Sequence, residues 1–200
     1  MLFVNEMPSE AREKMVYASL YLFTSKGFKE TSVLDIVEQA RVSKTTFYNH
    51  FTTKEDLLVS LCRQLIEEMI QSVKEAVAQE KKVTYKAYAG IRRYIEICMT
   101  RKHAARLLLI ISGGISQETA QVRREAIHQF AELIFETVQS ILPNESVDQS
   151  FRTVSKAMVG AINEVVLERL ITEDSTKDLD ELAHLLNRIV VGAFSQLAPG

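Results

Sequence analysis

The sequence predicts an all-α fold in which three short N-terminal helices precede a longer helical bundle. Only seven glycines and three prolines occur among the 200 residues, too few turn-forming residues for a sandwich or barrel of many short strands. Apolar residues recur instead at steps of three and four along most of the chain, which is the spacing of one helix face. No internal repeat or low-complexity tract indicates another architecture.

Three short helices are expected near the N-terminus. The first lies between Ser9 and Gly27, because glycine commonly ends a helix. The second spans 33–40 and follows the Thr-Ser pair at 31–32; with no Glu or Gln at its third position, its capping box is expected to be incomplete. The third spans 44–50, with Ser43 as its N-cap.

Longer helices follow. One begins after Thr53, with Glu55 and Asp56 in the first turn, where acidic side chains stabilise the helix dipole. Its length, to about Gln79, suggests a connector between a small and a large domain. The remaining helices are expected over 85–99, 102–112, 117–142, 147–171 and 179–197.

Charge and cysteine content argue against a highly charged protein that coats nucleic acid or membrane, and against a disulfide or zinc framework. The formal net charge of −2 means that nucleic-acid binding would need a local basic patch. Cys62 and Cys98 have no second ligand at metal-binding spacing, so reduced thiols and no metal or cofactor are expected. Neither a secretory signal nor an apolar run of about 20 residues is present, so a cytoplasmic protein without membrane association is expected.

The stretch TSVLDIVEQARVSKTTFYNHFTTKEDL, residues 31–57, carries the strongest functional signal. Two short helices joined by a turn of about three residues are what a helix-turn-helix requires. Apolar residues would brace the second helix, which leaves a mixed polar and aromatic face able to contact bases and phosphates. Five of the seven basic residues in 1–54 lie between Lys26 and Lys54, a plausible polarised patch.

This stretch resembles the DNA-binding region of the TetR family of bacterial transcription regulators, strongly over residues 9–58 and only in helix number and length beyond. By that resemblance Thr45 and Asn49 read bases. Arg41 replaces the glycine usual in the family's turn and must either adopt a left-handed backbone or shift the turn. The DNA-binding residues that the resemblance implies are Ser32, Arg41, Lys44, Thr45, Thr46, Tyr48, Asn49, His50 and Lys54.

The domain organisation expected is a DNA-binding domain over 1–54 and a ligand-binding and dimerisation domain over 55–200. Two apolar stripes near the C-terminus fit a four-helix interface between two chains, and the resemblance favours a homodimer on a palindromic operator. The expected interface residues are Val154, Met158, Ala161, Val165, Leu182, Leu186, Ile189 and Ala193.

A small-molecule cavity is expected among the central helices of the bundle. Aromatic and methionine side chains there are also ordinary core material, but an apolar cavity with an arginine-rich mouth would suit a hydrophobic effector with an anionic head, such as a fatty acyl-CoA. The candidate lining residues are Met69, Tyr88, Ile91, Tyr94, Ile95, Met99, Arg106, Leu107, Ile111, Arg123, Phe130 and Ile134.

The function expected is a homodimeric transcriptional repressor that a small hydrophobic effector releases from double-stranded DNA. Two alternatives stay open: an activator of the same family, and a helical protein-interaction module in which the helix-turn-helix is only structural. An enzyme is not expected, because the sequence contains none of the motifs GxxxxGK, GxSxG, HExxH or CxxC.

Overall fold

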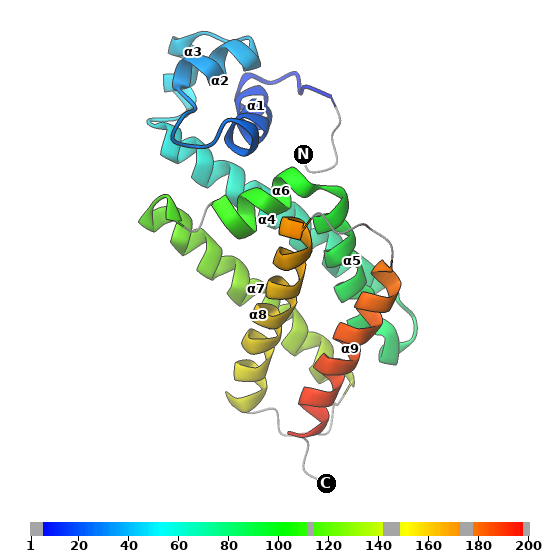
Figure 1. Ribbon diagram of the computed structural model, residues 1–200. Helices are drawn as coiled ribbons and strands as arrows, with labels where there is room; N and C mark the ends of the chain where they lie inside the picture. Colours follow the sequence, from blue (N-terminus) through cyan, green and yellow to red (C-terminus); the bar gives the residue numbers. More distant parts are fainter. Residues whose placement is uncertain (1–5, 112–113, 142–148, 173–177, 198–200) are drawn as a thin grey trace. The chain divides into compact units, whose positions relative to one another are not determined.

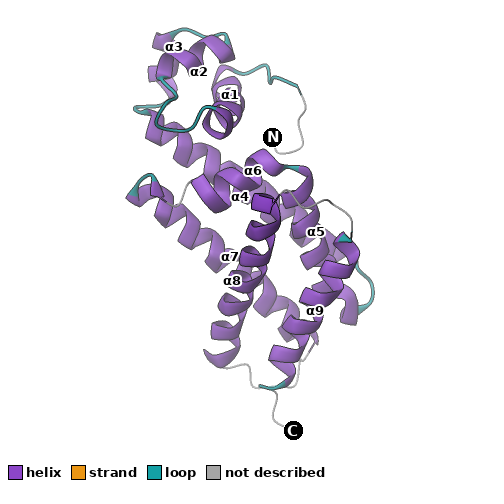
Figure 2. Cartoon of the chain, in the orientation of Figure 1, coloured by secondary structure: helices purple, strands orange, loops and turns teal. Residues whose placement is uncertain are grey.

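The computed structural model describes residues 6–111, 114–141, 149–172 and 178–197. Within these ranges every regular element is helical, which confirms the predicted all-α class (Figures 1 and 2). The helix ends predicted at Ser112, Leu142 and Val147 lie outside the described residues. None of the helices described is long and apolar enough to cross a membrane.

The chain divides into two compact units. The first comprises the residues up to Glu68 together with 101–123, and the second comprises 69–100 together with 124–200. Helices α4 (Lys54–Gln79) and α7 (Gln117–Ile141) each contribute residues to both units. The boundary that the sequence analysis predicts after residue 54 separates a DNA-binding domain from a ligand-binding domain by function, and it stays a prediction.

The first unit contains α1 (Ala11–Ser25), α2 (Val33–Ala40) and α3 (Lys44–His50), as predicted. It also contains α6 (Lys102–Arg106) and the π-helical turn η2 (Leu107–Ile111). Its core forms because each helix turns an apolar face inward. The fully buried side chains there include Met15, Val16, Phe23, Ile36, Phe47, Leu57 and Leu61.

The capping of α2 differs from the expectation. Ser32 accepts a hydrogen bond from the Asp35 backbone N–H, and the Asp35 carboxylate accepts one from the Ser32 N–H at 2.7 Å. The predicted incomplete box is therefore wrong: aspartate at the third position is long enough to close the reciprocal pair that Glu or Gln usually makes. Ser43 caps α3 as predicted, by accepting from the Thr46 N–H at 3.0 Å.

The second unit is built from α5 (Lys86–Thr100), α8 (Gln149–Thr172), α9 (Leu179–Ser195) and the second halves of α4 and α7. A short 3-10 turn, η1 (Val83–Tyr85), precedes α5. Helix α5 packs against both α8 and α9. Arg92 on α5 joins Asp180 at the start of α9 at 2.6 Å, so an ion pair adds to the apolar packing.

Candidate nucleic-acid interface and effector cavity

The turn between α2 and α3 has the geometry of a helix-turn-helix. Arg41 adopts a left-handed backbone, with φ 54° and ψ 48°, so the turn keeps its shape without the usual glycine. The Arg41 and Val42 N–H groups donate to the Glu38 and Val37 carbonyls at 3.1 and 2.9 Å. These bonds satisfy the last carbonyls of α2 and direct the chain into α3.

Helix α3 has one buried anchor and a broad exposed face. Phe47 is fully buried, whereas Tyr48 beside it is 59% exposed and meets the Phe47 ring edge-on at 5.3 Å between centroids. The exposed side chains of this helix are Lys44, Thr45, Tyr48, Asn49 and His50, and Thr46 is half-buried. The structure thus brings together the predicted α3 residues on one accessible surface, with the anchor behind them.

Two of the predicted hydroxyl contacts are engaged in helix caps. The Ser32 hydroxyl donates to the Asp35 carboxylate at 2.7 Å, and the Thr46 hydroxyl lies 2.8 Å from the hydroxyl of Ser43. Lys26 forms an ion pair with the same Asp35 oxygen at 2.8 Å. The Lys26 ammonium, together with the bonds from Ser32, holds the pKa of Asp35 far below its ordinary range. This carboxylate therefore links α1 to the first turn of α2.

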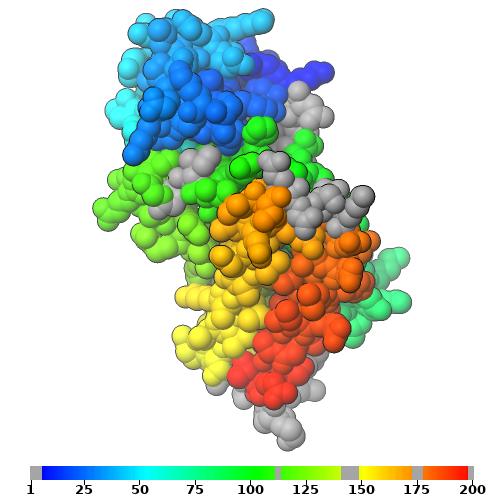
Figure 3. Space-filling model, viewed as in Figure 1, coloured from blue at the N-terminus to red at the C-terminus, as the bar shows by residue number. Residues whose placement is uncertain are grey.

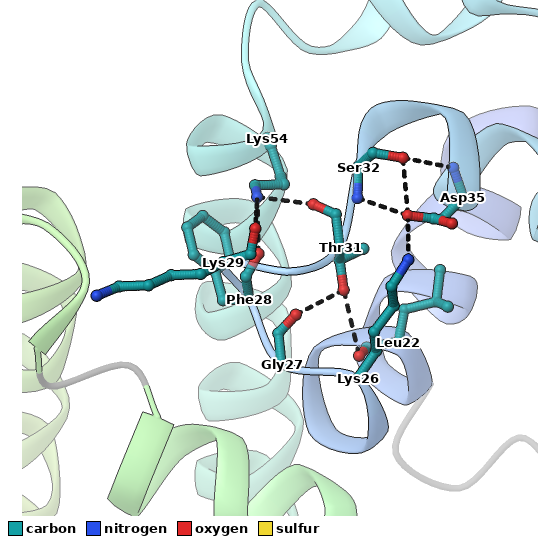
Figure 4. Close-up of polar contacts among 9 residues, drawn as sticks. All are labelled: Leu22, Lys26, Gly27, Phe28, Lys29, Thr31, Ser32, Asp35 and Lys54. Atoms are coloured by element: carbon teal, nitrogen blue, oxygen red, sulfur yellow. Dashed lines mark hydrogen bonds and ion pairs between the residues drawn. The ribbon is translucent and has the colours of Figure 1, made fainter.

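Lys54 holds the loop between α1 and α2 rather than projecting freely (Figure 4). Its ammonium donates to the carbonyls of Phe28 and Thr31, each at 2.7 Å, and lies 4.3 Å from the centroid of the Phe28 ring. The ammonium also donates to the Lys29 carbonyl at 3.5 Å, so all three donors of this lysine are directed at the loop. The family resemblance placed Lys54 among the DNA-binding residues, but the sequence carried no signal for this internal role.

A cavity of about 70 Å³ lies within the second unit. Four predicted residues line it: Ile91, Tyr94, Phe130 and Ile134. The lining residues that the sequence analysis missed are Val73, Val77, Ala87, Gly90, Leu133, Thr137, Val138, Val159, Ile162, Asn163 and Val190. Most of these residues follow one another at steps of three or four within their helices. That spacing predicts which helix face is buried, but it does not show which of the buried faces line a cavity.

The other predicted cavity residues lie elsewhere. Met69, Ile95 and Met99 are buried in the second unit away from the lining, and Tyr88 stacks on His184 at 4.2 Å between centroids. Those that belong to the first unit are Arg106, Leu107 and Arg123. The side chain of Ile111 lies outside the described residues. None of the residues that line this cavity is an arginine.

The outer sides of α8 and α9 adjoin on the face shown in Figure 3, in yellow to orange and in red. Of the predicted interface residues, Ala161 and Ile189 are exposed, Ile189 by 48%. Leu182 and Leu186 are buried inside the unit. The half-buried members are Val154, Met158, Val165 and Ala193. Only part of the predicted stripe is therefore accessible to a second chain.

Known proteins match this chain in two ways: in sequence over the region of α1, α2 and α3, which we call the three-helix head, and in the fold of the whole chain. The family model for bacterial regulatory proteins of the tetR family matches residues 17–61. The fatty acid metabolism regulator protein of Bacillus subtilis is 36% identical over 73 residues, which are 34% of this chain and 38% of that protein. This chain spans less than half the length of the curated relatives that it matches over the longest stretches.

Among the solved structures that share the fold are two fatty acid regulators. The fatty acid degradation regulator FadR from Bacillus halodurans superposes with a TM-score of 0.79 at 17% identity, covering 94% of this chain and 97% of that one. FadR from Bacillus subtilis in complex with stearoyl-CoA superposes with a TM-score of 0.75 at 21% identity, covering 90% and 97%. At these identities the likeness establishes the architecture alone.

Proposed function

Because the chain belongs to the TetR family, whose named members here are transcriptional regulators and not enzymes, we propose that it is a sequence-specific DNA-binding regulator. The observation that carries this proposal is α3, in which buried Phe47 leaves Lys44, Tyr48 and Asn49 exposed together. A short helix presented in this way, after a helix that braces it, is the element that enters a major groove.

Each exposed side chain on α3 has chemistry suited to a duplex. Asn49 can make paired hydrogen bonds with adenine, and Thr45 offers both a hydroxyl and a methyl group to base edges. Lys44 supplies a positive charge for phosphate, and Tyr48 and His50 add donors near the backbone. Arg41, which is exposed in the turn, is a further candidate for phosphate. We assign base reading to Thr45 and Asn49, and positioning to the others.

The regulator is proposed to act as a homodimer on a palindromic operator in the cytoplasm. One head covers only a half-site, and a second head supplies the other. Exposed Ala161 and Ile189 on adjoining helices support an apolar interface between two copies. A self-complementary patch of this kind is what a twofold axis requires. The cavity then gives each chain its own effector site.

A small hydrophobic effector is proposed to occupy the cavity and release the dimer from DNA. The lining is almost wholly apolar, which favours a hydrophobic molecule. The stearoyl-CoA bound to FadR of Bacillus subtilis makes acyl-CoAs the first compounds to test. Ligand sites for drug-sized molecules usually hold about 300–1,000 Å³, so an acyl chain must displace the helices around this smaller cavity. Release follows only if the effector prefers the DNA-incompetent state.

Selection of bound fragments from sheared genomic DNA tests DNA binding directly. The wild type is expected to enrich a few palindromic sites at physiological salt, whereas Tyr48→Ala enriches none. Tyr85→Ala is the matched control, because Tyr85 is also exposed, by 45%, but lies outside the three-helix head. Equal enrichment by wild type and Tyr48→Ala would favour the protein-interaction alternative.

The enriched sites then allow a test of effector control. Stearoyl-CoA and shorter acyl-CoAs are added to the protein–operator complex, and the fraction of bound DNA is measured. Release is the expected result for a repressor of this kind. Tighter binding on addition of the same compounds would instead support an activator, and an unchanged complex would exclude acyl-CoAs as effectors.

A further inference from the structure

The cavity in the second unit has few polar groups in its lining. None of its fifteen lining residues carries a charged side chain. Three are polar: Tyr94, Thr137 and Asn163. Burying a carboxylate or phosphate against such a lining would remove its water without supplying a cation, which is costly. The part of a ligand that enters this cavity is therefore uncharged.

Tyr94 and Asn163 form a hydrogen-bonded pair from two different helices. The Tyr94 hydroxyl donates to Asn163 Oδ1 at 2.5 Å, and Tyr94 is only 8% exposed. The Tyr94 ring meets Phe130 edge-on, with 5.3 Å between centroids. Packing on one side and a hydrogen bond on the other thus fix the phenol, and the phenol in turn fixes the Asn163 carboxamide at the cavity wall.

The Asn163 carboxamide keeps hydrogen-bonding capacity for a ligand. A carboxamide has an accepting oxygen and two N–H donors, and Tyr94 uses only the oxygen. Within the described part of the chain, Asn163 makes no other hydrogen bond. Its Nδ2 donors are therefore available to an acceptor in the cavity.

Thr137, the third polar residue, is arranged differently. Its hydroxyl donates to the carbonyl of Leu133 on its own helix at 2.7 Å. That bond satisfies the hydroxyl hydrogen locally, so Thr137 offers no donor to the cavity. Because the hydroxyls of Tyr94 and Thr137 already donate to other groups, Asn163 is the available donor among the described lining side chains. Thr137 is therefore a matched control for Asn163.

We propose that this cavity selects an uncharged hydrophobic molecule with a carbonyl oxygen, and that Asn163 Nδ2 donates to that oxygen while Tyr94 holds the carboxamide. A ketone, an ester and a thioester share this chemistry. The inference deepens the proposed effector function, on which it rests for its biological role. Asn163 is half-buried, and a ligand that covers its carboxamide without offering an acceptor leaves the N–H donors unpaired, which disfavours that ligand.

Three matched compounds test the inference on the full chain without DNA. They are methyl pentyl ketone, the alkene in which CH₂ replaces its carbonyl oxygen, and hexanoate, in which O⁻ replaces its methyl group. Their small size suits a cavity of about 70 Å³. Binding is followed by NMR of ¹⁵N-labelled protein through the Asn163 side-chain amide, a readout that tolerates weak affinity.

We expect the ketone to bind about tenfold more tightly than the alkene, a factor that corresponds to roughly 1.4 kcal/mol, and to shift the Asn163 amide resonances. Hexanoate is expected to bind more weakly than the ketone. Asn163→Leu should abolish the preference for the ketone, and Thr137→Val should retain it. The comparison of compounds on the wild type needs no variant, so it decides the question even if Asn163→Leu does not fold.

Several results would overturn the inference. These are equal binding of ketone and alkene, tighter binding of hexanoate, no binding of any of the three, or an unchanged preference in folded Asn163→Leu. Operator binding is measured separately, with wild type and Tyr48→Ala and no ligand. A failure there with a retained ketone preference would overturn the proposed function alone, and the reverse pattern would overturn only the assignment of Asn163.

Discussion

The ammonium of Lys54, at the first residue of α4, donates a 2.7 Å hydrogen bond to the carbonyl of Thr31, which immediately precedes the N-cap of α2. The same nitrogen donates to Phe28 and lies over its ring. Lys54 thereby fixes the segment that starts α2 from 23 residues away in sequence. A residue that the family resemblance placed among the DNA contacts therefore connects α4 to the loop between α1 and α2.

Lys54→Met should lower the free energy of unfolding by about 1–2 kcal/mol, because hydrogen bonds to a charged group typically contribute about 1.5–3 kcal/mol when intact and methionine retains only the packing on Phe28. Urea unfolding measures this loss. Lys44→Met is the matched control: Lys44 is exposed, so its removal should leave stability unchanged and reduce the salt dependence of DNA binding by about one phosphate contact. An unchanged free energy of unfolding in Lys54→Met would contradict a stabilising role for these hydrogen bonds.

Arg41→Gly should stabilise the protein by about 1 kcal/mol, because a left-handed backbone costs an L-residue roughly 1–2 kcal/mol and costs glycine almost nothing. Arg41 holds φ at 54°. Arg41→Lys keeps both the strain and the charge and should leave stability unchanged. If the arginine also contacts phosphate, the glycine variant binds DNA more weakly while it unfolds at higher urea. Lower stability of Arg41→Gly would show that other Arg41 contacts outweigh the strain.

Asp35 should make the head sensitive to acid. Its pKa is lowered in the folded chain, first by Lys26 and then by Ser32. The stability that it contributes is therefore complete above the unfolded pKa, about 3.9, and is lost as the pH falls through the lower folded value. Asp35→Asn should melt at a lower temperature than wild type near pH 7, and the difference should close as the pH falls from about 4 toward 2. A constant difference would contradict this linkage.

Ile189→Glu should dissociate the proposed dimer. A twofold-symmetric interface uses the same surface of both chains, so the substitution places two charges in the apolar contact. Light scattering is expected to report twice the chain mass for wild type and the chain mass for the variant. Val83→Glu is the control, since Val83 is 43% exposed, comparable to Ile189, and lies in η1 before α5. A wild type that is monomeric at all concentrations would contradict the homodimer.

The sequence by itself determined the helices and the helix-turn-helix in α2 and α3. The near absence of glycine and proline, the apolar periodicity and the Ser43 cap predicted helix boundaries within a few residues of those observed over most of the chain. These features act locally, through backbone hydrogen bonds and neighbouring turns, so a linear pattern carries them. The exposed face of α3 followed for the same reason, because helical spacing around one buried phenylalanine decides which side chains point outward.

Only the tertiary structure decided which groups act together. Lys54 meets the carbonyl of Thr31, and Tyr94 meets Asn163, across 23 and 69 residues of sequence. The cavity contains four of the twelve residues expected to line it, because several helices have apolar inward faces and their packing alone selects which of them leave a space. Helical periodicity marks a buried face, whereas the partner of that face depends on long-range packing that no local pattern records.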